Sequence, residues 1–128
     1  MAYYYTRITS LTYEDALEKV QAELKKEGFG VITEIDVKET LKKKIDVEFR
    51  KYKIIGACNP MFAHQALQLE SRIGTLLPCN VIVQELAEGR VEVSAINPLE
   101  SMKIVGNPSL QQIGSQVAAR LESVVQRI

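Results

Sequence analysis

The only two cysteines of the chain lie in tripeptides of nearly mirrored sequence, Cys58-Asn59-Pro60 and Pro78-Cys79-Asn80. Each tripeptide falls where a predicted strand meets a segment of different structure, and a predicted helix separates the two. Strand ends are common positions for functional groups, because the sheet is rigid and its end is accessible. We therefore predict any functional site of this chain at Cys58, Asn59, Cys79 and Asn80.

The two thiols allow two interpretations. Cys58 precedes a predicted helix N-terminus, where partial positive charge favours the thiolate and lowers the pKa of a thiol, and Cys79 would then be its resolving or ligating partner. Alternatively, both are small buried hydrophobic residues, which is the more common case for a free cysteine. The chain has no C-x-x-C motif, so a thioredoxin-like activity has no support.

His64 and Met102 are outer candidates for the same site. Together with the two cysteines they are chemically suitable for a soft metal such as Cu(I) or Zn(II). Their spacing matches no metal-binding signature, and we predict neither a metal nor another cofactor. His64 is the single histidine of the chain, which excludes a site that needs two histidines from one chain.

Residues 38–53 are the most basic stretch, with seven cations against three acids. A nucleic-acid surface would explain such a run, but the whole chain balances 16 basic against 16 acidic residues. Nucleic-acid-binding domains are usually basic overall. We therefore predict a solvated lysine face and no nucleic-acid partner. Glu70 and Glu85 are the carboxylates nearest the cysteine motifs, and solvated glutamates are the more common case.

A chain of 128 residues, 46% hydrophobic and 25% charged, is long enough for one domain with its own core. No stretch approaches the ~20 apolar residues that a membrane span requires, and the N-terminal residues lack the pattern of a signal peptide. We therefore expect a cytoplasmic protein without a membrane partner. In that compartment, two cysteines are more often thiols than a structural disulfide.

Periodicity and capping residues predict alternating strands and helices. Strands are predicted at 2–9, 30–35, 50–58, 80–86 and 90–96, and helices at 13–27, 37–44, 60–73 and 108–127. Thr12, Asp36, Asn59, Asn97 and Asn107 are the predicted N-caps, and the three asparagines are each followed by proline.

This order indicates an α+β domain in two layers, with helices on one face of a mostly antiparallel sheet. A parallel arrangement of the third and fourth strands is the alternative. If these two strands are antiparallel neighbours, the helix between them runs out and back over ~21 Å. The six residues 74–79 can span ~20 Å when extended, which would bring Cys79 near Cys58. Parallel strands would instead place the cysteines at opposite ends of the sheet.

Nearly the whole chain resembles the domain of unknown function 302 family. The resemblance rests on Gly56-Ala57-Cys58-Asn59-Pro60 and Leu77-Pro78-Cys79-Asn80-Val81, with Asn97-Pro98, Met102 and Gly106-Asn107-Pro108 further along. It implies a fold like that of the TATA-binding protein, β-α-β4-α with an inserted helix between strands three and four. It also implies small cytoplasmic proteins of bacteria and archaea that form homodimers, with no established substrate or reaction.

We therefore predict one domain over residues 1–128 that binds a small molecule. Its pocket would lie at the end of the sheet beside Cys58, Asn59, Cys79 and Asn80, with His64 and Met102 further out. One alternative is a thiol-dependent enzyme, or a redox or soft-metal protein, that uses both cysteines. Another is a structural or protein-interaction domain, and the sequence leaves open whether the protein is an enzyme.

Overall fold

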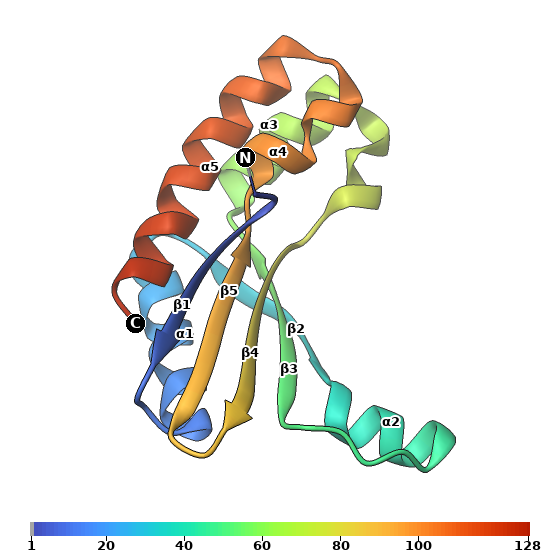
Figure 1. Cartoon of the computed structure of the whole chain (residues 1–128). Coiled ribbons are helices and arrows are strands. Elements are labelled where there is room, and N and C mark those ends of the chain that lie inside the picture. Colours follow the sequence, from blue (N-terminus) through green and yellow to red (C-terminus); the bar gives the residue numbers. More distant parts are fainter. Residues whose placement is uncertain (1) are drawn as a thin grey trace.

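The structure, a computed structural model, describes residues 2–128. Within these residues, five antiparallel strands form one sheet in the order β1-β5-β4-β3-β2 (Figure 1). The strands are β1 (Tyr4–Thr9), β2 (Gly30–Asp36), β3 (Tyr52–Cys58), β4 (Cys79–Ala87) and β5 (Arg90–Ile96). The α+β class and the antiparallel sheet are as predicted. The pairing of β3 with β4 is antiparallel, so the parallel alternative is wrong.

The helices differ in length and in their place around the sheet. They are α1 (Tyr13–Lys26), α2 (Val37–Ile45), α3 (Pro60–Leu69), α4 (Pro98–Ser101) and α5 (Pro108–Gln126). Two short 3-10 helices follow α3 and α4, at Ser71–Leu76 and Lys103–Val105. No helix within residues 2–128 is both long enough and apolar enough to cross a membrane.

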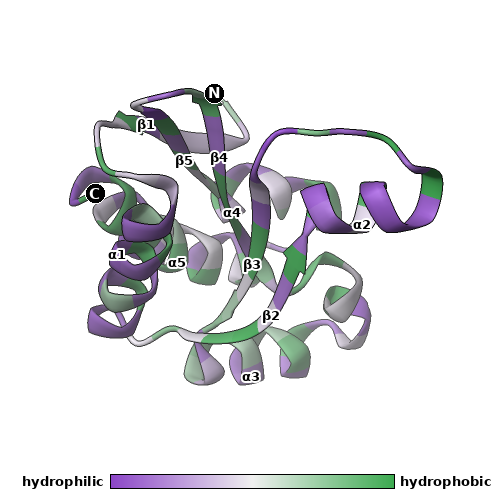
Figure 2. Ribbon diagram, turned by 90° about the horizontal axis from the view of Figure 1, so that it is seen from below, coloured by the Kyte–Doolittle hydropathy of each residue, from purple (hydrophilic) through white to green (hydrophobic). Residues whose placement is uncertain are grey.

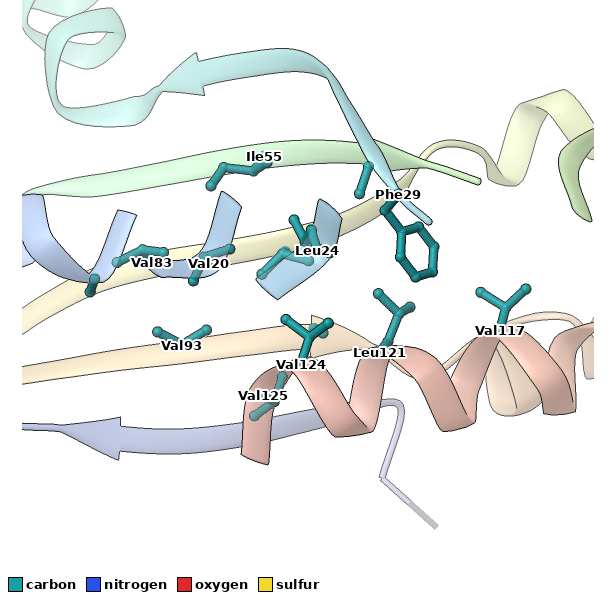
Figure 3. Packing of buried hydrophobic residues seen from close by; sticks show 14 of the residues in the cluster. Val20, Leu24, Phe29, Ile55, Val83, Val93, Val117, Leu121, Val124 and Val125 are labelled. Atoms are coloured by element: carbon teal, nitrogen blue, oxygen red, sulfur yellow. The ribbon is translucent and has the colours of Figure 1, made fainter. Parts of the chain in front are cut away.

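The hydrophobic core lies between the sheet and the two helices α1 and α5 (Figure 3). Because side chains alternate along a strand, β4 sends Val81 and Val83 into this core, and both are fully buried. The helices contribute apolar stripes at helical spacing, which include Val20, Leu24, Val117, Leu121 and Val124. The core thus holds both long helices on one face of the sheet.

Polar side chains gather on the opposite face of the sheet and bond to one another. Arg50 Nε donates to Gln84 Oε1 at 2.8 Å, and Gln84 Nε2 donates to Glu92 Oε1 at 2.9 Å. The hydroxyls of Thr6 and Ser94 lie 2.9 Å apart in a further hydrogen bond. These hydrogen bonds provide partners for the polar side chains on the face of the sheet that the helices do not cover.

Helix α2 stands apart from the two helices of the core and is mostly hydrophilic (Figure 2). None of its residues is buried. The exposed ammonium group of Lys42 pairs with Asp46 at 2.6 Å and with Glu48 at 2.9 Å. The basic stretch is therefore the solvated lysine face that the sequence predicted, with part of its charge neutralised by neighbouring carboxylates.

The helix predicted at 60–73 is shorter than expected. It ends at Leu69, because Glu70 adopts an extended backbone conformation with φ −149° and ψ 106°. The Glu70 carboxylate then accepts a hydrogen bond from the Arg72 backbone N–H at 3.0 Å and begins the 3-10 helix. Ile73 belongs to that 3-10 helix and is fully buried.

Candidate functional site

A partly open cavity of about 250 Å³ lies where β3 ends and β4 begins. Its walls come from β2, the facing ends of β3 and β4, helices α3 and α5, and the segments beside β4 and α4. The lining residues are Phe29, Ile32, Ala57, Cys58, Asn59, Phe62, Ala63, Ala66, Leu77, Pro78, Cys79, Met102, Ile113 and Val117. All of them except Asn59 and the two cysteines are entirely hydrocarbon or thioether side chains, so the cavity is strongly apolar.

The strand register brings the two cysteines to one end of the sheet. Ala57 pairs with Cys79 across β3 and β4, and Cys58 is the next residue along. Neighbouring antiparallel strands lie ~5 Å apart, so the two cysteine backbones are close. The prediction that antiparallel pairing would bring Cys79 near Cys58 is confirmed, and both cysteines are free thiols.

The β2–β3 pairing is irregular beside the cavity. Val31 pairs with Ala57, and Thr33 pairs with Gly56, so Ile32 is an extra residue in β2. Such a bulge redirects side chains locally, and Ile32 lines the cavity with 59% of its surface still exposed. Gly56 is required here, because a Cβ atom would collide with Thr33 Oγ1 and lie 2.8 Å from Pro78 Cγ.

Cys79 is held as a neutral thiol. Burial, and to a smaller extent the interaction with the nearby Cys58 thiol, raise its pKa from 9.0 to about 11. A thiol with this pKa is protonated near neutral pH, and only the thiolate is nucleophilic. The Cys79 side chain therefore serves as part of the apolar wall under these conditions.

Asn59 is the only amide side chain on the cavity wall. The sequence predicted it as the N-cap that bonds the first turn of α3, but its side chain makes no capping hydrogen bond. Instead, Asn59 Nδ2 donates to the backbone carbonyl of Glu27, just beyond α1, at 3.4 Å. The close approach of α1's C-terminal end thus draws the amide away from its own helix.

Arg120 of α5 meets the same carbonyl group. Its Nη1 donates to the Glu27 carbonyl oxygen at 3.3 Å, and its guanidinium carbon lies 5.3 Å from the centre of the Phe62 ring. Phe62 lines the cavity, so the guanidinium lies over a residue of the cavity wall. Arg120 itself lines a separate surface hollow together with Glu27 and Ala119. The sequence carried no local signal for this position, since Arg120 is a single charged residue on an amphipathic helix.

The structure brings together four of the six predicted site residues. Cys58, Asn59, Cys79 and Met102 line the cavity, and Met102 is only 4% exposed. Asn80 does not line it, because strand alternation turns the residue after Cys79 to the opposite face. There Asn80 borders a separate hollow beside Tyr52 and Ile82.

His64 does not line the cavity either. It lies exposed on α3, where its Nε2 is 3.3 Å from Gln68 Nε2. Across residues 2–128, no three His, Cys, Asp or Glu side chains come together in a group that could hold a metal ion. The apolar residues of the wall were missed as site residues, since stripes such as Ile113 and Val117 indicate a core without indicating a hollow in it.

Comparison with known proteins identifies the family of this chain. Residues 4–128 match the family described as domain of unknown function DUF302, and the chain belongs to that family. It is similar to an uncharacterized conserved DUF302 protein from Bacillus stearothermophilus, whose crystal structure superposes with a TM-score of 0.92. The two chains are 27% identical, and the match covers 99% of this chain and 98% of that one. No curated protein matches the chain.

Proposed function

We propose that this protein is a binding module for a small, largely apolar molecule that occupies the cavity at the Cys58 and Cys79 end of the sheet. The observation that carries the proposal is the cavity itself: a hollow of about 250 Å³ beside a well-packed core, with almost only apolar side chains around it. Protein interiors are usually filled to crystal-like density. An apolar hollow that reaches into the core is therefore space that a ligand of matching chemistry can fill.

The volume sets the size of the ligand. An atom the size of a water molecule takes ~30 Å³ in a liquid, so a cavity of about 250 Å³ holds roughly eight non-hydrogen atoms. Each methylene group that leaves water for such a site contributes ~0.8 kcal/mol to binding. The geometry thus fits a short alkyl chain or a single substituted ring.

The chemistry of the Cys79 thiol favours a binding role for this residue over a nucleophilic one. The raised pKa of Cys79 leaves its thiol protonated near neutral pH, and a protonated thiol is a poor nucleophile. Met102 adds a third sulfur to the wall. Sulfur groups are polarizable and pack well against apolar ligands of varied shape.

A titration with 1-octanol, followed by ¹H–¹⁵N NMR, tests this function. We expect saturable shifts of the backbone amide signals of Cys58, Phe62 and Met102. Ala63→Leu places a larger side chain on the cavity wall and should weaken binding at least tenfold. Ala119→Leu, an exposed position on α5 outside the wall, is the matched control and should bind like the wild type. Equal affinity in the two variants, or no saturable binding to the wild type, would contradict the proposal.

A further inference from the structure

We propose that the ligand is a small monocarboxylate whose apolar tail fills the cavity and whose carboxylate group is bound at the rim by Asn59 and Arg120. This inference rests on the proposed function, because it assigns a ligand class to the same cavity. It follows from two donor side chains next to the cavity: Asn59, which lines it, and Arg120, whose guanidinium lies over the ring of the lining residue Phe62.

Two hydrogen-bond donors converge at this rim. The Asn59 amide and the Arg120 guanidinium both donate to the one carbonyl oxygen of Glu27, at 3.4 and 3.3 Å. Charge-assisted hydrogen bonds to a carboxylate are shorter, ~2.7–2.9 Å. The two side chains therefore lie within reach of a common acceptor and are held by long, weak contacts. A carboxylate placed between them would accept stronger hydrogen bonds from both.

The Arg120 guanidinium also has donors to spare. An arginine side chain carries five N–H groups, and the contacts with Glu27 involve only Nη1. The distance from Arg120 Nη1 to the Glu27 carboxylate is 4.0 Å, which is too long for a hydrogen bond. Side-chain exposure of 45% leaves the group open to solvent and to a ligand.

The local charge balance favours an anion. The Glu27 carboxylate would repel one, but Arg127 Nη2 binds it at 3.0 Å. The buried carboxylate of Glu23 is bound by three cations: Arg127, and Lys19 and Lys26 of α1. Four cations therefore surround two carboxylates in this cluster: Lys19, Lys26, Arg120 and Arg127 against Glu23 and Glu27. Arg120 is the member of this cluster that contacts the cavity wall, through the Phe62 ring.

Phe62 connects the polar rim to the apolar interior. Its ring lines the cavity and lies beneath the Arg120 guanidinium. A ligand that follows this ring has its charged end at the guanidinium and its tail against apolar residues such as Leu77, Met102 and Ile113. The seven-carbon tail of octanoate matches the roughly eight non-hydrogen atoms that the cavity holds. Octanoate is therefore a suitable probe.

The test compares octanoate with 1-octanol, which has a similar tail and no charge. At pH 7.5 and low salt, NMR titration should show octanoate binding at least tenfold more tightly than octanol. Arg120→Gln should remove most of this preference and leave octanol affinity within about twofold. Arg72→Gln is the matched control, since Arg72 is 88% exposed and outside the cavity wall. This variant should keep the full preference.

A second variant keeps the shape of the site and replaces a neutral hydrogen-bond donor by a negatively charged acceptor. Asn59→Asp should weaken octanoate binding at least tenfold and change octanol binding far less. Equal binding of octanoate and octanol by the wild type would overturn the carboxylate assignment while leaving the cavity function intact. Octanoate binding that survives Ala63→Leu would overturn it as well, because the anion would then bind elsewhere. Failure of both probes to bind would overturn both proposals.

Discussion

Two helices of this domain begin with the same Asn-Pro pair and use it differently. At the start of α5, Asn107 caps its own helix by accepting a hydrogen bond from the Ser109 backbone N–H at 2.9 Å. At the start of α3, the Asn59 side chain makes no such bond and lines the cavity instead. Both helices have proline in the first turn, so local sequence does not explain the difference.

The difference shows that α3 lacks a stabilising interaction that α5 has. An N-cap side chain contributes ~1 kcal/mol to helix stability, and the Asn59 amide is directed towards Glu27 of a different element. Departures from local rules are expected where a protein has a functional site. The contrast therefore supports the cavity end of the sheet as the site, and it can be tested at three positions.

The largest change in the free energy of unfolding is expected at Asn97, which precedes Pro98 and caps α4. Its buried side chain accepts a hydrogen bond from the Leu99 N–H at 3.1 Å and donates to the Ala2 carbonyl at 3.3 Å. Asn97→Ala removes both bonds within the protein and should lower the free energy of unfolding by ~2 kcal/mol. Urea denaturation measures the free energy of unfolding of the variant and of the wild type. A difference below ~0.5 kcal/mol would contradict the prediction, because the Asn97 cap would then contribute little to the stability of the protein.

The cavity end of the sheet also differs from the start of α5 because it contains the buried thiol of Cys79. Burial and, to a smaller extent, the interaction with the Cys58 thiol raise the pKa of Cys79 from 9.0 to about 11. The unfolded chain releases this proton at lower pH than the folded chain. Its contribution to stability is therefore complete below pH 9 and is lost as the pH rises towards 11, by up to ~1.4 kcal/mol per pH unit. Cys79→Ala should remove this dependence. Urea denaturation of both proteins at pH 8, 9 and 10 measures it, and parallel curves would contradict the raised pKa.

The smallest effect on stability is expected at Asn59 itself. Asn59→Ala should change the free energy of unfolding by less than ~0.5 kcal/mol, because no cap is lost. Asn107→Ala is the matched control and should lower it by ~1 kcal/mol. In binding experiments the order should reverse, with octanoate affinity reduced in Asn59→Ala and unchanged in Asn107→Ala. Equal losses of unfolding free energy in Asn59→Ala and Asn107→Ala would contradict the difference in capping between α3 and α5.

Most of the secondary structure could be predicted because its signals are local. Thr12 and Asp36 cap α1 and α2 as expected, each accepting a hydrogen bond from the backbone N–H three residues on. The apolar stripe of α5 likewise identified core residues such as Leu110 and Leu121. The early end of α3 was missed because Glu70 competes for backbone bonds in the following turn.

The site could be predicted only in part. The two cysteine motifs lie at the end of the sheet where the apolar cavity is found, and Met102 lies on its wall. That this cavity is a binding site stays a prediction. The sequence analysis predicted Asn80 and His64 in the pocket, but neither lines the cavity. Proximity in sequence cannot tell which face of a strand or helix a residue occupies. Arg120 was not among the predicted residues, since its place beside the cavity wall arises from a contact with Phe62 between two helices. The homodimer and the likeness to the TATA-binding protein stay predictions.

The sequence by itself determined the elements of this protein, their class and the position of its two thiols. These features depend on capping, periodicity and turn residues, which act over a few neighbouring positions. Only the tertiary structure decided that the ends of β3 and β4 enclose an apolar cavity, and that Asn59 and Arg120 meet at one carbonyl oxygen. A cavity is the space that distant segments leave unfilled when they pack together, and no single segment encodes it.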